Sequence, residues 1–382
     1  MLIFLLIFSY APEDSNAHYL MDKQLAHYFP AWDGQFDSTT NAFRTSQGCL
    51  DFWHWYIDLE TKVTVNLCSW LGLRYRNEYH GDYDNHVANH YFEPFIMAGQ
   101  NLRLLFTIAP HYYKGEDEIG IGFSLGKSYL NYFQTLFIVE DFDRNYSFKD
   151  IPDGADKIIY QQFPIKSKTI LNQYWRTGYC TFSLELTNRY WLRSTELTET
   201  YPTYFYERGL KRSFYTRINQ DLDAWRFGLI CDLAQSERSH IDTSQVHKED
   251  IFEMILEPTV AYRINDQWMP TLYLTYNYKT DNDSLVFFNT DEDYWVDYQR
   301  DIYAYLFDLV YCPRGNFLWH FGMQQQFYHN NQGDDTRERR FILGFEYRYN
   351  KVWLYVVEAM EGDFPMPHWL HNRTYVQLLL KL

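Results

Sequence analysis

Residues 316–329 read NFLWHFGMQQQFYH, and their two alternating halves differ in chemistry. Every second residue from Phe317 to Met323 is large and apolar, and the row continues through Gln325 and Phe327. The residues between them are mostly polar or small: Leu318, His320, Gly322, Gln324 and Gln326. A period of two with unlike halves is typical of a β-strand between two unlike environments. A soluble sheet would turn the apolar half inward, whereas a membrane barrel would turn it toward lipid.

The same alternation recurs in many segments, among them 50–60, 63–76, 101–113, 179–192, 251–263 and 341–349. The segment 301–311, DIYAYLFDLVY, favours the membrane alternative. Its tyrosines lie near both ends, where their hydroxyls would reach the two membrane interfaces while Phe307 and Leu309 cross the hydrocarbon. The core of a secreted soluble β protein would instead have to satisfy many buried tyrosine hydroxyls. We therefore expect a membrane barrel rather than a soluble sheet.

Composition agrees with this expectation and excludes some functions. The chain has 382 residues, of which 46% are hydrophobic and 20% aromatic, yet its mean hydropathy is −0.47. Aromatic girdles around a barrel give such a profile without any long apolar run. The formal net charge of −16 argues against nucleic acid as a partner, because phosphates attract clustered Lys and Arg.

Short and long connections alternate along the chain, as they do in outer-membrane barrels. Short turns are expected at 60–62, 99–101, 126–128, 219–224, 265–268, 314–316 and 350–351. Longer, acidic connections are expected at 77–90, 142–157, 238–249, 280–294, 329–336 and 362–371. The fold class is thus all-β, a transmembrane antiparallel up-and-down β-barrel of about 18 strands, with 16 as the alternative. Its first strand should begin within residues 22–47.

The two ends of the sequence add targeting signals. Residues 1–17, MLIFLLIFSYAPEDSNA, read as a signal peptide, which leaves 18–382 as a single barrel domain. The last ten residues, RTYVQLLLKL, alternate apolar and polar up to the terminus. They resemble the C-terminal assembly signal of bacterial outer-membrane barrels, with Leu382 where that family usually has Phe. The chain therefore resembles porin-type barrels, which implies the outer membrane of a Gram-negative bacterium, with membrane lipid and lipopolysaccharide around it.

The polar half of the strands predicts a lumen that carries both signs of charge. The expected pore-lining residues are Asp58, Arg74, Arg76, Arg103, Glu185, Arg226, Asp232, Glu253, Glu257, Asp308, His320, Gln324, Gln326, Glu346 and Arg348. Facing rows of opposite charge would orient polar solutes in a water-filled channel. This pattern predicts a porin-like channel for passive diffusion of ions or small polar solutes, and acidic loops predict a weak cation preference. The alternative is that these charges only pair and hydrate the interior.

Two other functions stay open at this point. A wide barrel could form a sheath around a partner protein such as an electron-transfer cytochrome, or assemble as a homo-oligomer. It could also be a barrel-embedded hydrolase. The candidate nucleophile, base and carboxylate that lie close together in the sequence are Ser239, His240 and Asp242. Adjacent residues rarely form a nucleophile–base pair. We expect no enzyme, no catalytic residue and no cofactor.

One further cluster has the chemistry of a metal site. It consists of His80, Asp82, Asp84, His86 and His90. Imidazole and carboxylate groups suit several divalent ions. The cluster lacks the HExxH spacing, and a polar surface loop explains it equally well. We therefore expect no metal.

Overall fold

The computed structural model describes residues 19–28, 42–49, 56–82, 86–110, 117–126, 131–140, 155–162, 164–197, 206–241, 245–287, 293–333, 335–350, 352–361 and 370–381. The predicted signal peptide lies outside these residues, so that prediction and the division into domains stay untested. None of the helices in the described part of the chain is long and apolar enough to cross a membrane.

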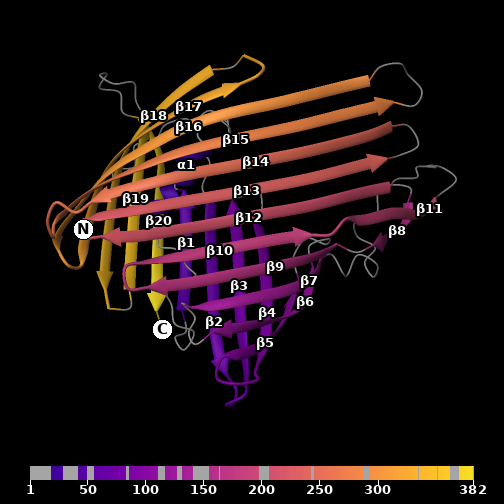
Figure 1. Cartoon of the computed structure of the whole chain (residues 1–382), viewed down its shortest axis with the longest axis horizontal. Coiled ribbons are helices and arrows are strands. Elements are labelled where there is room, and N and C mark those ends of the chain that lie inside the picture. Colours follow the sequence, from indigo (N-terminus) through magenta and orange to yellow (C-terminus); the bar gives the residue numbers. More distant parts are fainter. Residues whose placement is uncertain are drawn as a thin grey trace.

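One short helical segment precedes a succession of strands (Figure 1). The helical elements are α1 (Tyr19–Leu25) and the 3-10 turn η1 (Ala26–Tyr28). The strands are β1 (Ala42–Cys49), β2 (Tyr56–Asn66), β3 (Leu71–Asp82), β4 (His86–Met97), β5 (Leu102–Ala109), β6 (Glu118–Gly126), β7 (Tyr132–Glu140), β8 (Ala155–Gln162), β9 (Ile165–Trp175), β10 (Gly178–Thr187), β11 (Tyr190–Leu197), β12 (Tyr206–Leu222), β13 (Trp225–Ile241), β14 (Gln245–Tyr262), β15 (Trp268–Phe287), β16 (Asp293–Arg314), β17 (Phe317–Asn330), β18 (Asp335–Tyr349), β19 (Val352–Glu361) and β20 (Leu370–Lys381).

The strands form one antiparallel sheet that closes on itself, because β1 pairs with both β2 and β20. Strand β8 leads into β9 across Pro164, and β10 leads into β11 across Asn188 and Arg189. These two pairs act as two long strands, since β8 pairs with β11 as β9 pairs with β10. Over the residues that the structure describes, the circuit therefore holds eighteen strands. The predicted up-and-down barrel is confirmed, with the larger of the two expected strand counts.

The two faces of the sheet differ as the alternation predicts. On β5, Phe106 and Ile108 are 39% and 45% exposed, whereas Leu105 and Thr107 are buried. Trp319, Phe321 and Met323 of β17 are exposed in the same way. The β1–β20 pairing closes the sheet, and the exposed apolar side chains form an outer face suited to lipid. We call the opposite face the inner face.

Aromatic pairs occupy the ends of this outer face. Near the short turns, Trp268 stacks on Tyr311 with ring centroids 4.2 Å apart, and Trp225 lies 4.6 Å from Tyr262. Toward the opposite rim, Tyr276 stacks on Tyr303 at 5.0 Å. Amphipathic rings favour the two membrane interfaces. The apolar band between these rows is therefore the membrane-spanning part.

The wall of the barrel is much taller on one side (Figure 1). Strands β15 and β16 contain 20 and 22 residues, whereas β5 and β6 contain 8 and 9. About 9–11 residues suffice for a tilted strand to cross a bilayer. The far halves of the long strands therefore continue the sheet beyond the hydrocarbon.

This extension overturns part of the predicted loop map. The acidic residues Asp281 and Asp283 lie within β15 and not in a loop, and β3 and β4 run through most of the predicted loop 77–90. A strand outside the membrane needs no apolar outer row, so its sequence resembles a loop. The predicted turn at 60–62 is also wrong. Strand β2 passes through it with Glu60 opposite Glu78, and the chain turns at 67–70.

Candidate functional site: the lumen and its plug

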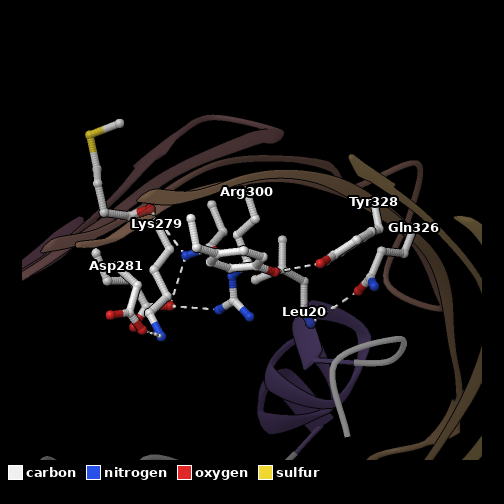
Figure 2. A network of polar contacts seen from close by, with 10 residues as sticks. Leu20, Lys279, Asp281, Arg300, Gln326 and Tyr328 are labelled. Carbon is white, nitrogen blue, oxygen red and sulfur yellow. Dashed lines mark hydrogen bonds and ion pairs between the residues drawn. The ribbon is translucent and has the colours of Figure 1, made fainter. Parts of the chain in front are cut away.

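Residues 19–28, which we call the plug, lie on the inner face of the tall wall against β15, β16 and β17. Leu20, Met21 and Gln24 are fully buried there. Figure 2 shows the helix beneath the arch of the sheet, with Gln326 pointing from the wall to Leu20 at the start of the helix. The lumen is thus partly filled by a segment of the same chain.

The barrel supplies the hydrogen bonds that this short helix needs. Gln326 Oε1 accepts from the backbone N–H groups of Leu20 and Met21 at 3.0 and 3.3 Å. Gln324 Nε2 donates to the Met21 carbonyl at 2.9 Å and to Gln24 Oε1 at 3.2 Å. The first N–H groups of a helix have no partner within it, and a helix of this length is unstable alone. The two glutamines therefore stabilise both the helix and its position.

Apolar packing covers the helical stripe formed by Leu20, Leu25 and Tyr28. Leu20 packs with Ile302 and Ala304 of β16. Leu25 and Tyr28 share a second cluster with inner residues of β16, β18 and β19, namely Leu306, Ile342, Tyr355 and Val357. These inner side chains would otherwise face the lumen, so removal of their apolar surface from water holds the plug in place.

A polar relay ties the middle of the plug to β14 and β15. Gln24 Nε2 donates to Thr275 Oγ1 at 2.6 Å, and Thr275 Oγ1 donates to Glu257 Oε2 at 2.6 Å. His27 Nε2 lies 2.5 Å from Glu257 Oε1, and the His27 ring stacks on Tyr273 with centroids 4.2 Å apart. Both oxygens of the buried Glu257 carboxylate thus face plug-linked groups.

The Tyr28 end of the plug has poorer polar contacts. Its ring meets His320 edge-on at 5.1 Å, above a His320 Nδ1–Asp308 Oδ2 contact of 2.8 Å. Among the described residues, three buried atoms here have no hydrogen-bond partner: Tyr28 Oη, Asp308 Oδ1 and His320 Nε2. All three residues also line the cavity at this end of the plug. Burial and the nearby Asp308 carboxylate raise the pKa of Tyr28.

A single glycine makes room for this tyrosine. A Cβ atom on Gly322 would lie 2.4 Å from Tyr28 Oη and 3.0 Å from Ile342 Cβ. Such distances are shorter than ordinary contacts, so any larger residue requires the tyrosine to move. The segment that decides the fold therefore also shapes the seat of the plug, through Gly322, Gln324 and Gln326.

Lys23 of the plug lies near a network of charged side chains on the barrel wall. Burial lowers the pKa of Lys23, whereas the carboxylates of Glu253 and Asp232 oppose that shift. Glu253 Oε1 accepts from Asn277 Nδ2 at 2.8 Å and lies 3.4 Å from Arg300 Nη2. Further out, the Tyr298 and Tyr328 hydroxyls are 2.5 Å apart.

The side of the barrel formed by the shorter strands β3–β10, which we call the low wall, holds its charges differently. There they pair with charges on nearby strands. Arg74 Nη1 lies 3.4 Å from Glu93 Oε2, and Arg76 covers the Tyr91 ring at 3.8 Å. Lys166 Nζ bridges Glu118 at 2.6 Å and Glu140 at 2.8 Å, and the next inner lysine, Lys168, pairs with Glu185. These side chains keep part of their surface exposed. Paired, partly hydrated charges are what a water-facing inner wall requires.

Two cavities adjoin the plug and this wall. One, of about 420 Å³, lies at the His27 and Tyr28 end and includes Arg217, Arg226, Asp308 and Arg348 in its lining. The other, of about 290 Å³, lies toward the opposite rim and is lined by residues that include Glu140, Lys166, Glu185, Lys211, Arg212 and Glu253. Both have charged linings, so both suit polar solutes rather than lipid.

The structure places the predicted pore-lining residues on the inner face, except that the side chain of Asp58 lies outside the described part. Glu257, Gln324 and Gln326 hold the plug, and Asp308, His320, Glu346 and Arg348 lie beside its Tyr28 end. Asp232 and Glu253 face Lys23. The remaining five are spread around the barrel: Arg74, Arg76, Arg103, Glu185 and Arg226. Whether they border a path for solutes stays a prediction.

Sequence reasoning missed the plug, Thr275 and Arg217. The plug has a recognisable signal, because residues 20, 21, 24, 25 and 28 share one helical face. The inner row of β16 has another, since Ile302, Leu306 and Val310 are too apolar for a strand that faces water. Together these two patterns indicate a helix covering that strand.

The candidate metal and catalytic sets are only partly described, and of the metal cluster the structure describes the side chain of His90 alone. His90 Nδ1 lies 2.9 Å from Tyr75 Oη and 3.0 Å from Asn77 Nδ2, and no group of three or more ligating residues occurs in the described part of the chain. Ser239 and His240 are neighbours on β13, so their side chains lie on opposite faces. Asp84 and Asp242 fall outside the described residues, as do the side chains of His80, Asp82 and His86.

A closed antiparallel sheet with an apolar outer face defines an outer-membrane β-barrel protein, and it places this chain in an outer membrane. No protein-family model and no curated protein matches the sequence.

Solved structures of similar fold are bacterial outer-membrane proteins. OmpT of Vibrio cholerae has 10% identity and a TM-score of 0.40, over 92% of this chain and 100% of its own. The outer membrane channel DcaP of Acinetobacter baumannii has 10% identity and a TM-score of 0.36, over 90% and 97%. CdiB of the same organism has 9% identity and a TM-score of 0.41, over 90% and 60%. At these scores the likeness carries nothing about the site.

Proposed function

We propose that this chain is a channel for the passive diffusion of ions and small polar solutes across the outer membrane of a Gram-negative bacterium. The observation that carries the proposal is the plug itself. A barrel of eighteen strands encloses a lumen wide enough for water, and here a ten-residue segment narrows it. The protein then acts as a conduit rather than as an enzyme.

The plug is built to be displaced from one end. Its Leu20 end has four hydrogen bonds to Gln324 and Gln326, whereas its Tyr28 end covers unsatisfied polar atoms. Movement of the Tyr28 end gives water access to those atoms and offsets part of the apolar area that becomes exposed. Two positions of the plug would therefore differ by little free energy, as a gate requires.

A weak cation preference is part of the proposal. The net charge is −16, and acidic residues such as Asp281, Asp283 and Asp297 lie on the strand ends that project past the membrane. An acidic mouth raises the local concentration of cations and lowers that of anions. The preference should weaken as salt is raised, because the ions screen the mouth over about 10 Å at 0.1 M.

Single-channel recording in planar bilayers tests the proposal. The full chain should conduct ions in small, flickering steps, and a variant lacking residues 19–28 should conduct in larger, steadier steps. A KCl gradient should give a reversal potential of the sign expected for K⁺ preference. If the deletion variant retains its β-sheet circular dichroism in micelles and passes no ions, the chain is not a channel.

The sheath alternative has its own readout. A partner protein inside the barrel would have to displace or cover the plug on β15–β17. Stoichiometric copurification of a second chain, together with loss of conductance when it is present, would favour a sheath over an open channel.

A further inference from the structure

The cavity at the Tyr28 end of the plug has an unbalanced charge. Three of its arginines come from the barrel wall: Arg217, Arg226 and Arg348. Two of them are already paired. Arg226 contacts Asp221 through Nε at 2.6 Å and Nη2 at 3.2 Å, and Arg348 pairs with Glu346.

The carboxylates around the cavity are also occupied. Asp308 lies 2.8 Å from His320, and Glu257 faces His27 and Thr275. Asp308 Oδ1 has no hydrogen-bond partner, yet no ion pair joins Asp308 or Glu257 to Arg217 among the described side chains. This leaves the charge of Arg217 as the one that the surrounding acidic groups do not neutralise by direct contact.

The strand register explains why Arg217 differs from the other inner cations. Arg74 stands opposite Glu93, Lys168 opposite Glu185 and Arg226 opposite Asp221. Arg217 stands between Thr181 on β10 and Ile230 on β13, neither of which is acidic. Among the side chains that the structure describes, no carboxylate lies within ion-pair distance of it.

Aromatic groups complete the surroundings of Arg217. Its guanidinium carbon lies 5.7 Å from the centroid of the Tyr179 ring, close enough for a cation–π contact that leaves the N–H groups free to donate. Tyr273, which stacks on His27 of the plug, lines the same cavity. A volume of about 420 Å³ suits a small organic molecule.

We propose that this cavity binds a small organic carboxylate, with Arg217 as the group that recognises its charge. A planar guanidinium matches a carboxylate through two parallel hydrogen bonds. The tyrosine rings pack against the rest of the solute, which lies against the plug through His27. This inference rests on the proposed channel function, because the solute reaches the cavity through the lumen.

Titration calorimetry of the purified full chain in detergent micelles tests this site without any need for conductance. Benzoate and benzamide are suitable probes, because they share shape and differ in charge. Benzoate should bind saturably at one site, about tenfold more weakly to Arg217→Met, and benzamide should bind wild type no better than benzoate binds that variant. Arg217→Lys, which keeps the charge without the planar fork, should lie between.

Arg74→Met is the matched control, since it removes an inner arginine from the low wall and should leave benzoate binding unchanged. Equal benzoate affinity in wild type, Arg217→Met and Arg217→Lys would overturn the proposal. Tighter binding of inorganic phosphate than of benzoate would overturn the assignment to carboxylates. A chain that conducts ions and ignores benzoate loses this inference alone, whereas one that binds benzoate and conducts nothing loses the channel.

Discussion

The barrel has two kinds of inner wall built from the same strand alternation. Along β14–β18 the inner side chains are as buried as those of a soluble core: Ile302, Leu306 and Gln324 have no exposed surface. Along β3–β10 the charged inner side chains are partly exposed, as in the Arg74–Glu93 pair at 21% and 22%. The first wall faces the plug, and the second faces the lumen.

The difference shows that an inner face does not have one composition. Where a segment of the chain covers the wall, the strands combine apolar groups and amides with buried charged groups such as Glu257 and Asp308. On the other wall, exposed pairs of opposite charge accompany a smaller apolar cluster around Leu105 and Leu136. We therefore call β14–β18 of the tall wall the plugged wall, and the low wall, β3–β10, the open wall. Four sets of substitutions test whether the two walls have separate roles.

The largest effect should come from replacing the two glutamines of the plugged wall together. Gln324→Leu with Gln326→Leu removes four hydrogen bonds and leaves the N–H groups of Leu20 and Met21 without their partner. At about 0.5–1.5 kcal/mol each, the loss of these four bonds should weaken plug docking by roughly 2–6 kcal/mol. The open probability in planar bilayers should rise at least tenfold.

The matched control for this pair is Gln134→Leu, on the inner row of β7 in the open wall. It makes the same chemical change on a strand outside β15–β17, where the plug docks. Its open probability should equal that of wild type. A glutamine pair variant with unchanged gating would mean that these amides do not hold the plug.

The open wall should lose stability when Lys166 is replaced. Glu118 and Glu140 stand directly opposite each other on β6 and β7, and Lys166 Nζ contacts both. Lys166→Met leaves two carboxylates facing each other in a partly buried position, which should cost about 1–3 kcal/mol. Urea unfolding in micelles measures this loss, and single-channel gating should stay unchanged.

Lys211→Met is the control variant. Lys211 lines the same cavity of about 290 Å³ as Lys166, and its side chain is exposed. Its unfolding free energy should stay within about 0.5 kcal/mol of wild type. Equal losses for both lysines would mean that net charge, rather than the Glu118–Glu140 contact, decides the stability of this wall.

A smaller effect should follow from Gly322→Ala at the Tyr28 end of the plug. The new methyl group would meet Tyr28 Oη at 2.4 Å, so the ring has to shift. We expect a loss of about 1–2 kcal/mol in plug docking. Combining the change with Tyr28→Phe removes the oxygen that clashes, so the double variant should gate more like Tyr28→Phe alone. Additive effects of the two changes would contradict this steric account.

The fold was largely predictable because lipid imposes a strict period of two. Trp319, Phe321 and Met323 are as exposed as an outer row must be, and the strand count followed from the turns. The protruding strand ends were not predictable in the same way. The part of β15 around Asp281 and Asp283 lies beyond the membrane, so solvent rather than lipid covers its outer face. Its sequence therefore has no apolar outer row that would distinguish a strand from a loop.

The site was predictable in its parts and not in its assembly. The inner positions of Gln324, Gln326 and Glu257 followed from alternation, but their role depends on a helix more than 200 residues away in the sequence. Contacts of that range depend on closure of the whole barrel. The unusual apolar inner residues Ile302 and Leu306 were the local sign that something covers them.

The smallest expected effect comes from removing one hydroxyl group, first from the plugged wall and then from the open wall. Thr275→Val breaks the relay from Gln24 to Glu257 while keeping the shape of the side chain, and should weaken plug docking by about 1 kcal/mol. Thr107→Val makes the same change at a buried inner position of β5, in the open wall. Open probability should therefore rise about fivefold in the first variant and stay unchanged in the second. An equal rise in both would show that any loosening of the barrel releases the plug, and the two walls would then have no separate roles in gating.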